Sequence, residues 1–224
     1  MLRRRGDLAG AESLFQNALQ IFRKASGPEH PDVASTLFQL AQIAGDREDY
    51  DASERLFRQC LAIDRKTLGE NHPDYAIDLV HFSRTLLLRG KYDEAASDAQ
   101  QGLQITEATS GKDHPQIAFA EIYLAEVHLA RREPALAEPL LRDALRIRER
   151  TFRPGDWRTG VPKSVLGETL TALGRYDEAE PLLLDAQRVL KEVPGIQAQE
   201  ARTNRARLAA LEAIRNRPPV RAAR

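Results

Sequence analysis

The stretch Gly27-Pro28-Glu29-His30-Pro31 decides the fold, because its pattern returns twice at a constant distance. It recurs as Gly69-Glu70-Asn71-His72-Pro73 and as Gly111-Lys112-Asp113-His114-Pro115, so each His-Pro pair lies 42 residues after the one before. Two further columns keep this step: tyrosines at Tyr50, Tyr92 and Tyr176, and small residues at Ala18, Cys60, Gly102, Ala144 and Ala186. A constant period of this length is the sequence signature of a repeat protein.

Each period predicts two amphipathic helices. Proline is favoured in the first helical turn, and the residue before a proline avoids helical backbone angles, so the first helix is expected to begin at the His-Pro pair. Its apolar residues then follow at helical spacing, as Val33, Leu37, Leu40 and Ile43 do in one period. The second helix is expected to begin at the tyrosine column, after a turn such as Arg89-Gly90-Lys91.

These periods predict a single solenoid domain over residues 1–215. We expect an unpaired helix at 8–25, helix pairs at about 31–67, 73–109, 115–152 and 157–192, and a capping helix at about 197–215. In the last pair Asp156-Trp157 takes the place of the His-Pro pair. Residues 216–224 form a basic tail that we expect to be disordered, because Pro218-Pro219 ends any helix. One pair cannot bury its apolar face alone, whereas stacked pairs can.

Composition excludes several classes of protein. The chain has 224 residues, of which 33 are basic and 33 acidic, so no bulk charge favours nucleic acid or a membrane surface. One cysteine excludes an internal disulfide framework and suits a reducing compartment. No apolar run approaches the roughly 18 residues of a membrane span, and none follows the charged start of the chain. We therefore expect a cytoplasmic protein with no signal peptide and no membrane segment.

The G-x-x-H-P loops, the Gly-Arg-Tyr-Asp-Glu-Ala-Glu turn at 174–180 and the alternating apolar stripes resemble the tetratricopeptide repeat (TPR). The chain resembles the 42-residue form of this repeat, which is similar to the repeats of kinesin light chains, from about residue 6 to 192. The segment 155–168 also resembles the closing repeat of TPR tails on bacterial serine/threonine kinases, although the chain has no kinase signature. The resemblance implies an all-α fold, a right-handed α-solenoid of stacked antiparallel helix pairs.

The resemblance also implies that the first helix of each pair lines a concave face that binds peptides or partner proteins. Typical long repeats carry an Asn-Asn pair on this helix, but here the corresponding pairs include Phe38-Gln39 and Ile122-Tyr123, so an asparagine ladder is not expected. The predicted partner-binding groove consists of Phe38, Gln39, Gln42, His81, Arg84, Ile122, Tyr123 and Glu126. The alternative is that these residues serve ordinary packing between repeats.

We expect no catalytic residues, no metal and no cofactor, and therefore no enzyme. The histidines of the His-Pro pairs lie on successive repeats, about 20 Å apart for helices spaced by about 8–10 Å. Zinc ligand atoms lie about 2.0–2.3 Å from the ion, so these histidines are expected to serve helix entry instead. Cys60 is expected to be a small buried residue without a histidine partner, and Arg84 to lower the pKa of His81. The acidic residues are expected on solvated helix faces and in first turns.

The leading functional hypothesis is a non-catalytic scaffold that binds a protein or peptide in the groove. A detached regulatory TPR region of a bacterial signalling kinase system is one alternative, and self-association through the exposed face of helix 8–25 is another. A third is an adaptor for nucleic acid, which is disfavoured because basic tails are more often solvated. It would use the C-terminal arginines, Arg202, Arg205, Arg207, Arg215, Arg217, Arg221 and Arg224. The identity of the partner, the pathway and the oligomeric state stay open at this level.

Overall fold

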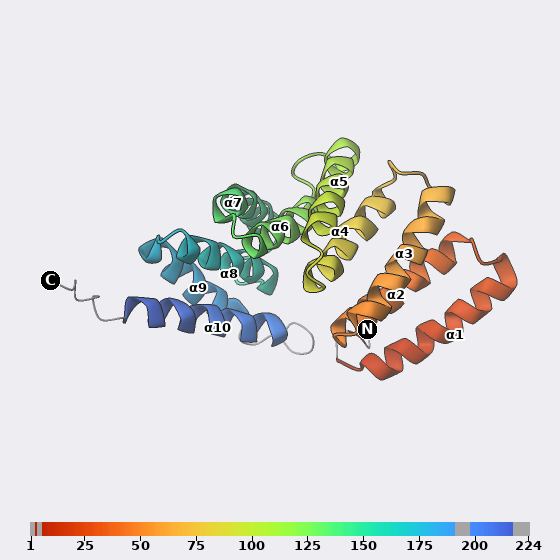
Figure 1. The fold of residues 1–224 in the computed structure, drawn as a ribbon, viewed down its shortest axis with the longest axis horizontal. Helices are drawn as coiled ribbons and strands as arrows, with labels where there is room; N and C mark the ends of the chain where they lie inside the picture. Colours follow the sequence, from red (N-terminus) through yellow and green to blue (C-terminus); the bar gives the residue numbers. More distant parts are fainter. Residues whose placement is uncertain (1–2, 4–5, 191–197, 217–224) are drawn as a thin grey trace.

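The computed structural model describes residue 3 and residues 6–190 and 198–216. These residues form ten α-helices and no strand, which confirms the all-α solenoid. The helices are α1 (Leu8–Ser26), α2 (Pro31–Asp46), α3 (Tyr50–Thr67), α4 (Pro73–Leu88), α5 (Tyr92–Ser110), α6 (Pro115–Ala130), α7 (Pro134–Thr151), α8 (Trp157–Ala172), α9 (Tyr176–Leu190) and α10 (Ala198–Arg215). They stack in chain order as a curved array, with α1 at one end and α10 at the other (Figure 1).

Parts of the predicted layout fall outside the described residues. The predicted tail after Asn216 and positions 191, 192 and 197 of the predicted helices belong to these parts. Each helix within the described ranges is too short or too polar to cross a lipid bilayer.

Each first helix begins with the same side-chain cap. The imidazole Nδ1 of His30 accepts a hydrogen bond from the backbone N–H of Asp32 at 3.2 Å. In the same way, His72 accepts from the N–H of Asp74 at 3.1 Å, and His114 from the N–H of Gln116 at 3.3 Å. In α8 the carboxylate of Asp156 replaces the imidazole and accepts from the N–H of Arg158 at 3.0 Å. Such a cap satisfies a backbone donor that has no partner within the helix. The exchange of His-Pro for Asp-Trp therefore keeps the physical function of the position.

The turn inside each pair needs one residue with positive φ. Gly90 and Gly174 supply it with φ of 73° and 75°, a backbone conformation that glycine adopts without steric cost. The turns of the two other pairs hold Glu48 and Arg132 at the equivalent position, with φ of 64° and 63°. A side chain there costs roughly 1 kcal/mol, so these two turns are held by the packing of the helices around them.

The two helices of a pair approach most closely at the column of small residues. A Cβ added to Gly102 of α5 would lie 2.6 Å from Cγ2 of Val80 and 2.9 Å from the carbonyl oxygen of Ala76, both on α4. In the preceding pair, Sγ of Cys60 lies 3.2 Å from the carbonyl oxygen of Ala34. The small residues therefore set the distance between the paired helices.

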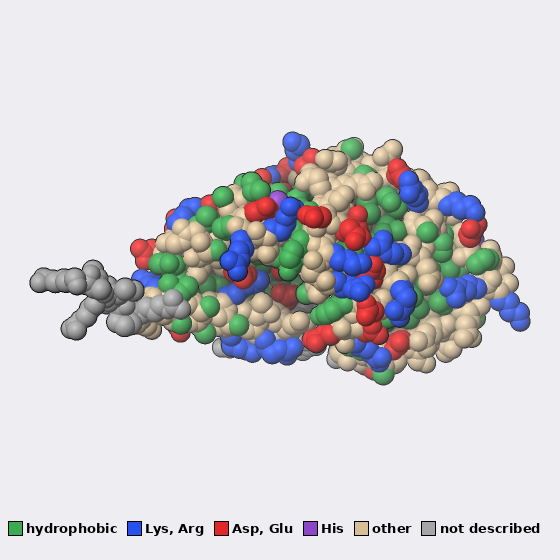
Figure 2. All heavy atoms as spheres, in the orientation of Figure 1, with side chains coloured by type: hydrophobic (Ala, Val, Ile, Leu, Met, Phe, Trp, Pro, Cys, Tyr) green, Lys and Arg blue, Asp and Glu red, His purple; other side chains and the backbone are tan. Residues whose placement is uncertain are grey.

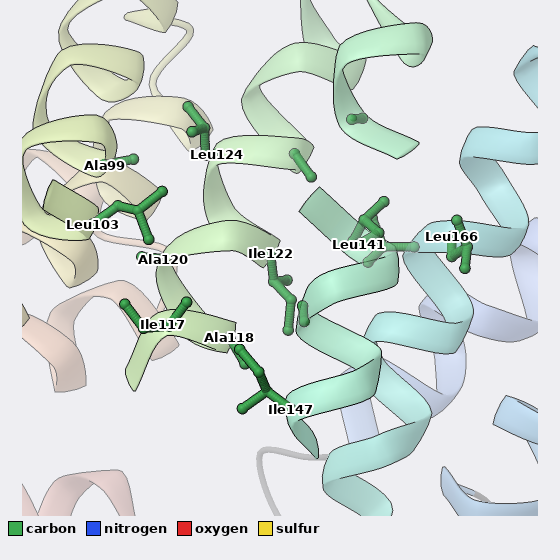
Figure 3. Close-up of a cluster of buried hydrophobic side chains, with 14 of the residues drawn as sticks. Ala99, Leu103, Ile117, Ala118, Ala120, Ile122, Leu124, Leu141, Ile147 and Leu166 are labelled. Atoms are coloured by element: carbon green, nitrogen blue, oxygen red, sulfur yellow. The ribbon is translucent and has the colours of Figure 1, made fainter. Parts of the chain in front are cut away.

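Buried apolar side chains of successive pairs join into one large cluster that reaches from α4 to α10. Ile117 and Ile122 of α6 belong to this cluster together with Leu141 and Ile147 of α7 and Leu166 of α8 (Figure 3). Every pair thus buries its apolar stripe against its neighbours, as a solenoid requires.

A polar cluster interrupts the apolar core between α3 and α4. Cys60, Asp64 and Asp78 are all buried, and Sγ of Cys60 lies 2.9 Å from Oδ2 of Asp78 and 3.8 Å from Oδ2 of Asp64. Burial and the neighbouring Asp64 raise the pKa of Asp78 to about 8, and burial raises the pKa of Asp64. The expectation that acidic residues lie on solvated faces or in first turns is wrong for these two, because each faces the adjoining helix rather than solvent. It is also wrong for Glu54 and Glu121, which are buried.

Replacement of Gly102 by alanine is expected to destabilise the protein by about 1–3 kcal/mol, because the new methyl group overpacks the contact between α4 and α5. Gly45 on α2 is the matched control, since a Cβ there would meet only Oγ of Ser53 at 3.6 Å. Gly45→Ala is expected to stabilise by up to about 1 kcal/mol through helix propensity. Urea unfolding followed by circular dichroism measures both changes, and equal effects would contradict the close contact.

Replacement of Asp78 by asparagine is expected to flatten the pH dependence of stability. The folded chain keeps a proton on Asp78 up to about pH 8, whereas an unfolded aspartate releases it near a pKa of about 3.9. The folded state binds more protons in this window, so the free energy of unfolding falls as pH rises, by at most about 1.4 kcal/mol per pH unit for one group. Urea unfolding of both proteins across this window measures the slope.

Asp93→Asn provides the control for this experiment, because the side chain of Asp93 is 92% exposed. It is expected to leave the slope unchanged. Burial also raises the pKa of Glu121 to about 8, so Asp78→Asn is expected to reduce the slope without abolishing it. Parallel curves for Asp78→Asn and wild type would show that Asp78 does not hold its proton.

Candidate functional site on the inner face

The predicted groove residues lie on three successive first helices. Phe38, Gln39 and Gln42 belong to α2, His81 and Arg84 to α4, and Ile122, Tyr123 and Glu126 to α6. We use the name inner face for the surface formed by these residues except Ile122, together with Phe119 of α6. All members of this surface are partly exposed.

A row of aromatic side chains crosses the inner face from α2 to α6. The ring centroid of His81 lies 5.3 Å from that of Phe38, 6.0 Å from that of Tyr123 and 6.1 Å from that of Phe119. The rings of Phe38 and His81 meet edge to face, an arrangement that aromatic pairs favour. His81 and Tyr123 meet because the repeat period brings positions 81 and 123 next to one another on stacked helices. The equivalent position on α2 holds Gln39, and Phe38 joins the row from the neighbouring column.

His81 is the centre of this row and is neutral at physiological pH. Burial, together with the nearby cations Arg3 and Arg84, lowers the pKa of His81 to about 4. The direction agrees with the effect expected of Arg84 alone, but burial is the larger cause. A neutral imidazole among aromatic rings offers one hydrogen-bond donor and one acceptor without bringing a charge into the row.

Charged side chains border the row on the side of α6 and α8. The guanidinium of Arg84 lies 5.6 Å from the ring centroid of Tyr123 and 3.4 Å from Oε1 of Glu200 on α10. Arg207, also on α10, contacts Oε2 of Glu168 at 2.6 Å and Oε1 of Glu126 at 4.0 Å. The ionic border is therefore made largely between the inner face and α10.

The opposite border involves the start of the chain. Nε of Arg3 lies 2.5 Å from Oδ2 of Asp46 at the end of α2, and Arg3 also donates to the side chain of Gln42. Gln42 is thus engaged within the protein, and its amide oxygen already has a donor.

Ile122 does not belong to this surface. It is 3% exposed and packs in the large core cluster (Figure 3). The physical reason is its column: the equivalent residue Val80 faces Gly102 on the second helix of its own pair. Phe38 of α2 shares this column. Its ring packs edge to face on Phe57 of α3, with 5.8 Å between the ring centroids, but it stays partly exposed and also reaches His81.

Several residues of the region were missed from sequence, most notably Phe119 and Arg148. The guanidinium carbon of Arg148 on α7 lies 3.9 Å from the ring centroid of Phe119, although the Arg148 side chain is buried and its Nε has no hydrogen-bond partner. Burial lowers the pKa of Arg148 to about 10. Phe119 precedes Tyr123 by one helical turn, and this spacing was the available signal. Arg148 occupies a column with no common residue type, so the sequence gave no signal for its position.

The cluster of Cys60, Asp64 and Asp78 lies apart from the inner face, in the core between α3 and α4. In the described part of the chain it is the one group of three potential metal ligands whose ligand atoms lie within 4.8 Å of one another. Burial and the adjacent carboxyl groups raise the pKa of the Cys60 thiol, which keeps it protonated and unsuited to nucleophilic attack. The Cys60 thiol lies within hydrogen-bond distance of a carboxyl oxygen of each aspartate.

Comparison with known proteins identifies the repeat. One tetratricopeptide repeat family model matches residues 1–66, 40–108 and 85–150, and a second matches residues 163–193. No curated protein matches the chain. Together the two family models cover most of the sequence.

Solved structures share the fold. A putative kinesin light chain of Podospora anserina with nearly identical TPR-like repeats is 23% identical, covers 84% of this chain and 89% of its own, and gives a TM-score of 0.65. BtubC (BKLC) from P. vanneervenii is 17% identical over 100% of this chain and 96% of its own, with a TM-score of 0.66. A thermophilic TPR protein of Thermus thermophilus is 19% identical over 94% and 97%, with a TM-score of 0.55.

At these identities the structural likeness shows the fold alone, and it agrees with the kinesin-light-chain-like form of the repeat. The repeats of this family are typically non-catalytic scaffolds for protein–protein interaction. The chain belongs to the tetratricopeptide repeat family.

Proposed function

We propose that the inner face binds an extended segment of a partner protein across α2, α4 and α6. The observation that carries this proposal is the aromatic row of Phe38, His81, Phe119 and Tyr123, which lies partly exposed on three stacked helices. Aromatic side chains are enriched among the residues that contribute most to binding energy at interfaces.

The chemistry of the inner face favours a segment that presents apolar or aromatic side chains. The row supplies apolar contact area, and neutral His81 supplies one directional hydrogen bond. Arg84, Glu126, Glu200 and Arg207 largely pair among themselves, so they add orientation rather than a strong net charge. Without an asparagine ladder, recognition rests on side chains of the partner more than on its backbone.

The observed contacts favour this function over a nucleic-acid adaptor. Arg207 pairs with Glu168 and donates to Ser164, and Arg215 pairs with Asp177 and Glu180. These arginines of the C-terminal stretch hold α10 on the array. Basic side chains also lie among acidic ones over the face seen in Figure 2, whereas nucleic-acid-binding proteins cluster them on one side. Within the residues that the structure describes, no comparable contact supports the kinase-tail alternative.

Tyr123→Ala is expected to weaken binding of an inner-face ligand by about tenfold or more, since truncation of an interface anchor typically costs over about 1.4 kcal/mol. Peptides selected by phage display on the wild-type protein supply the ligand, and fluorescence anisotropy measures their dissociation constants. His81→Ala is expected to weaken binding as well, because it interrupts the row at its centre.

Tyr92→Ala on α5 is the matched control, because Tyr92 is an exposed aromatic residue on a second helix. It is expected to leave the affinity unchanged, with circular dichroism confirming that all variants are folded. Selected peptides that bind Tyr123→Ala as tightly as wild type, or that lose affinity only with Tyr92→Ala, would place binding away from the inner face.

A further inference from the structure

Arg148 on α7 is a buried cation without a counter-ion in the described part of the chain. The residue is 2% exposed, and its Nε has no hydrogen-bond partner. Within residues 3, 6–190 and 198–216, no carboxylate pairs with its guanidinium. By contrast, Arg207, whose side chain is 12% exposed, pairs with Glu168 at 2.6 Å. A buried charge without a partner is strongly unfavourable for folding, so its presence at this position requires an explanation.

The architecture of the repeat does not require an arginine here. In the other complete pairs the column of Arg148 holds Asp64, Thr106 and Leu190, and all three are buried. A threonine or a leucine therefore satisfies the packing of a second helix at this point. The cation serves one place in the middle of the array and not the stacking of its helices.

The guanidinium of Arg148 contacts the aromatic row. Its carbon lies 3.9 Å from the ring centroid of Phe119, which belongs to the inner face. It also lies 5.6 Å from the ring centroid of Phe152, the residue that follows α7. Both contacts are of the cation–π type, so they hold the group in place but give its N–H donors no conventional acceptor. The donors therefore remain available next to the row.

The charges around Arg148 do not neutralise it. Burial is the largest cause of its lowered pKa, which at about 10 still leaves the guanidinium charged at physiological pH. Asp156 favours the charged form, but it already binds Arg158 through contacts of 2.8 and 2.7 Å. The Arg158 guanidinium in turn lies 3.7 Å from the ring centroid of Phe152. Two cations and one anion are thus gathered here, which leaves this end of the row positive.

We propose that Arg148 binds an oxyanion of the partner segment, namely the carboxylate of an acidic residue beside the side chain that packs on Phe119. This inference rests on the proposed function of the inner face. A guanidinium and a carboxylate match in geometry, because two N–H donors can meet two oxygens, and such charge-assisted pairs are stronger than neutral hydrogen bonds. Since Arg148 is almost inaccessible, a group seated against Phe119 reaches it more readily than a free ion does.

A double-mutant cycle between protein and peptide tests the pairing. Peptides selected by phage display on the wild-type protein are synthesised with their glutamate or with glutamine in its place, and fluorescence anisotropy measures the dissociation constants. On wild type the glutamine peptide is expected to bind about tenfold more weakly or worse, because a hydrogen-bonded charge is lost. On Arg148→Leu the two peptides are expected to differ by less than about twofold, since the cation is absent.

Two further variants separate the charge from the packing. Arg153→Leu is the matched control, because Arg153 is exposed and its replacement removes the same charge; it is expected to keep the tenfold preference for glutamate. Arg148→Lys retains a cation and is expected to keep part of the preference. Leu190 shows that a leucine fits this column, and urea unfolding checks that Arg148→Leu is folded.

Two results would overturn the proposal: selected peptides without an acidic residue, or an equal loss with the glutamine peptide on wild type and on Arg148→Leu. Neither is the failure of the proposed function, which appears instead as equal peptide affinity for wild type and Tyr123→Ala. A peptide with phosphoserine in place of glutamate tests the other source of an oxyanion. Weaker binding of this peptide supports the carboxylate, whereas tighter binding that disappears in Arg148→Leu would assign the subsite to a phosphoryl group.

Discussion

The close contact between the two helices of each pair is the constraint on which the rest of the structure depends. At Gly102 the partner helix leaves no room for a methyl group, and at Cys60 the sulfur touches the backbone of α2. Because every pair meets at the same column, successive pairs are related by a nearly constant step. Residues 42 positions apart in sequence thereby become neighbours on stacked helices, and this relation, not local propensity, places side chains on the inner face.

His81 shows how this relation produces a functional surface. Its ring lies beside Tyr123 because the two occupy equivalent positions on α4 and α6, and it meets Phe38 from the neighbouring column of α2. Burial in this row keeps the imidazole neutral, while the charges beside it pair across to α10 and to Arg3. The result is an aromatic strip with an ionic border. A partner would gain affinity from the strip and orientation from the border, which is the division of labour that protein interfaces commonly use.

Sequence periodicity was sufficient for the fold and for the three first helices that carry the candidate site, since spacing alone specifies which helices stack. Periodicity does not distinguish neighbouring residues of a first helix that face the groove from those that face the paired helix. Ile122 is therefore predicted on the surface, although it is buried. Residues outside the repeating columns were also missed. Asp64 and Arg148 share a column of the second helices that has no common residue type, and the column of Asp78 has none either. Their positions depend on three-dimensional neighbours that no spacing rule contains.

α10 connects the stack of helices with the inner face. Its buried residues Ala201 and Leu211 pack in the apolar clusters of the array, while Glu200 and Arg207 contact side chains of α4, α6 and α8. The same helix therefore closes the core on one side and makes the ionic border of the aromatic row on the other. In the proposed site, a ligand that separates Arg84 from Glu200 acts on the position of α10, so the ionic border and the packing of the last helix are linked.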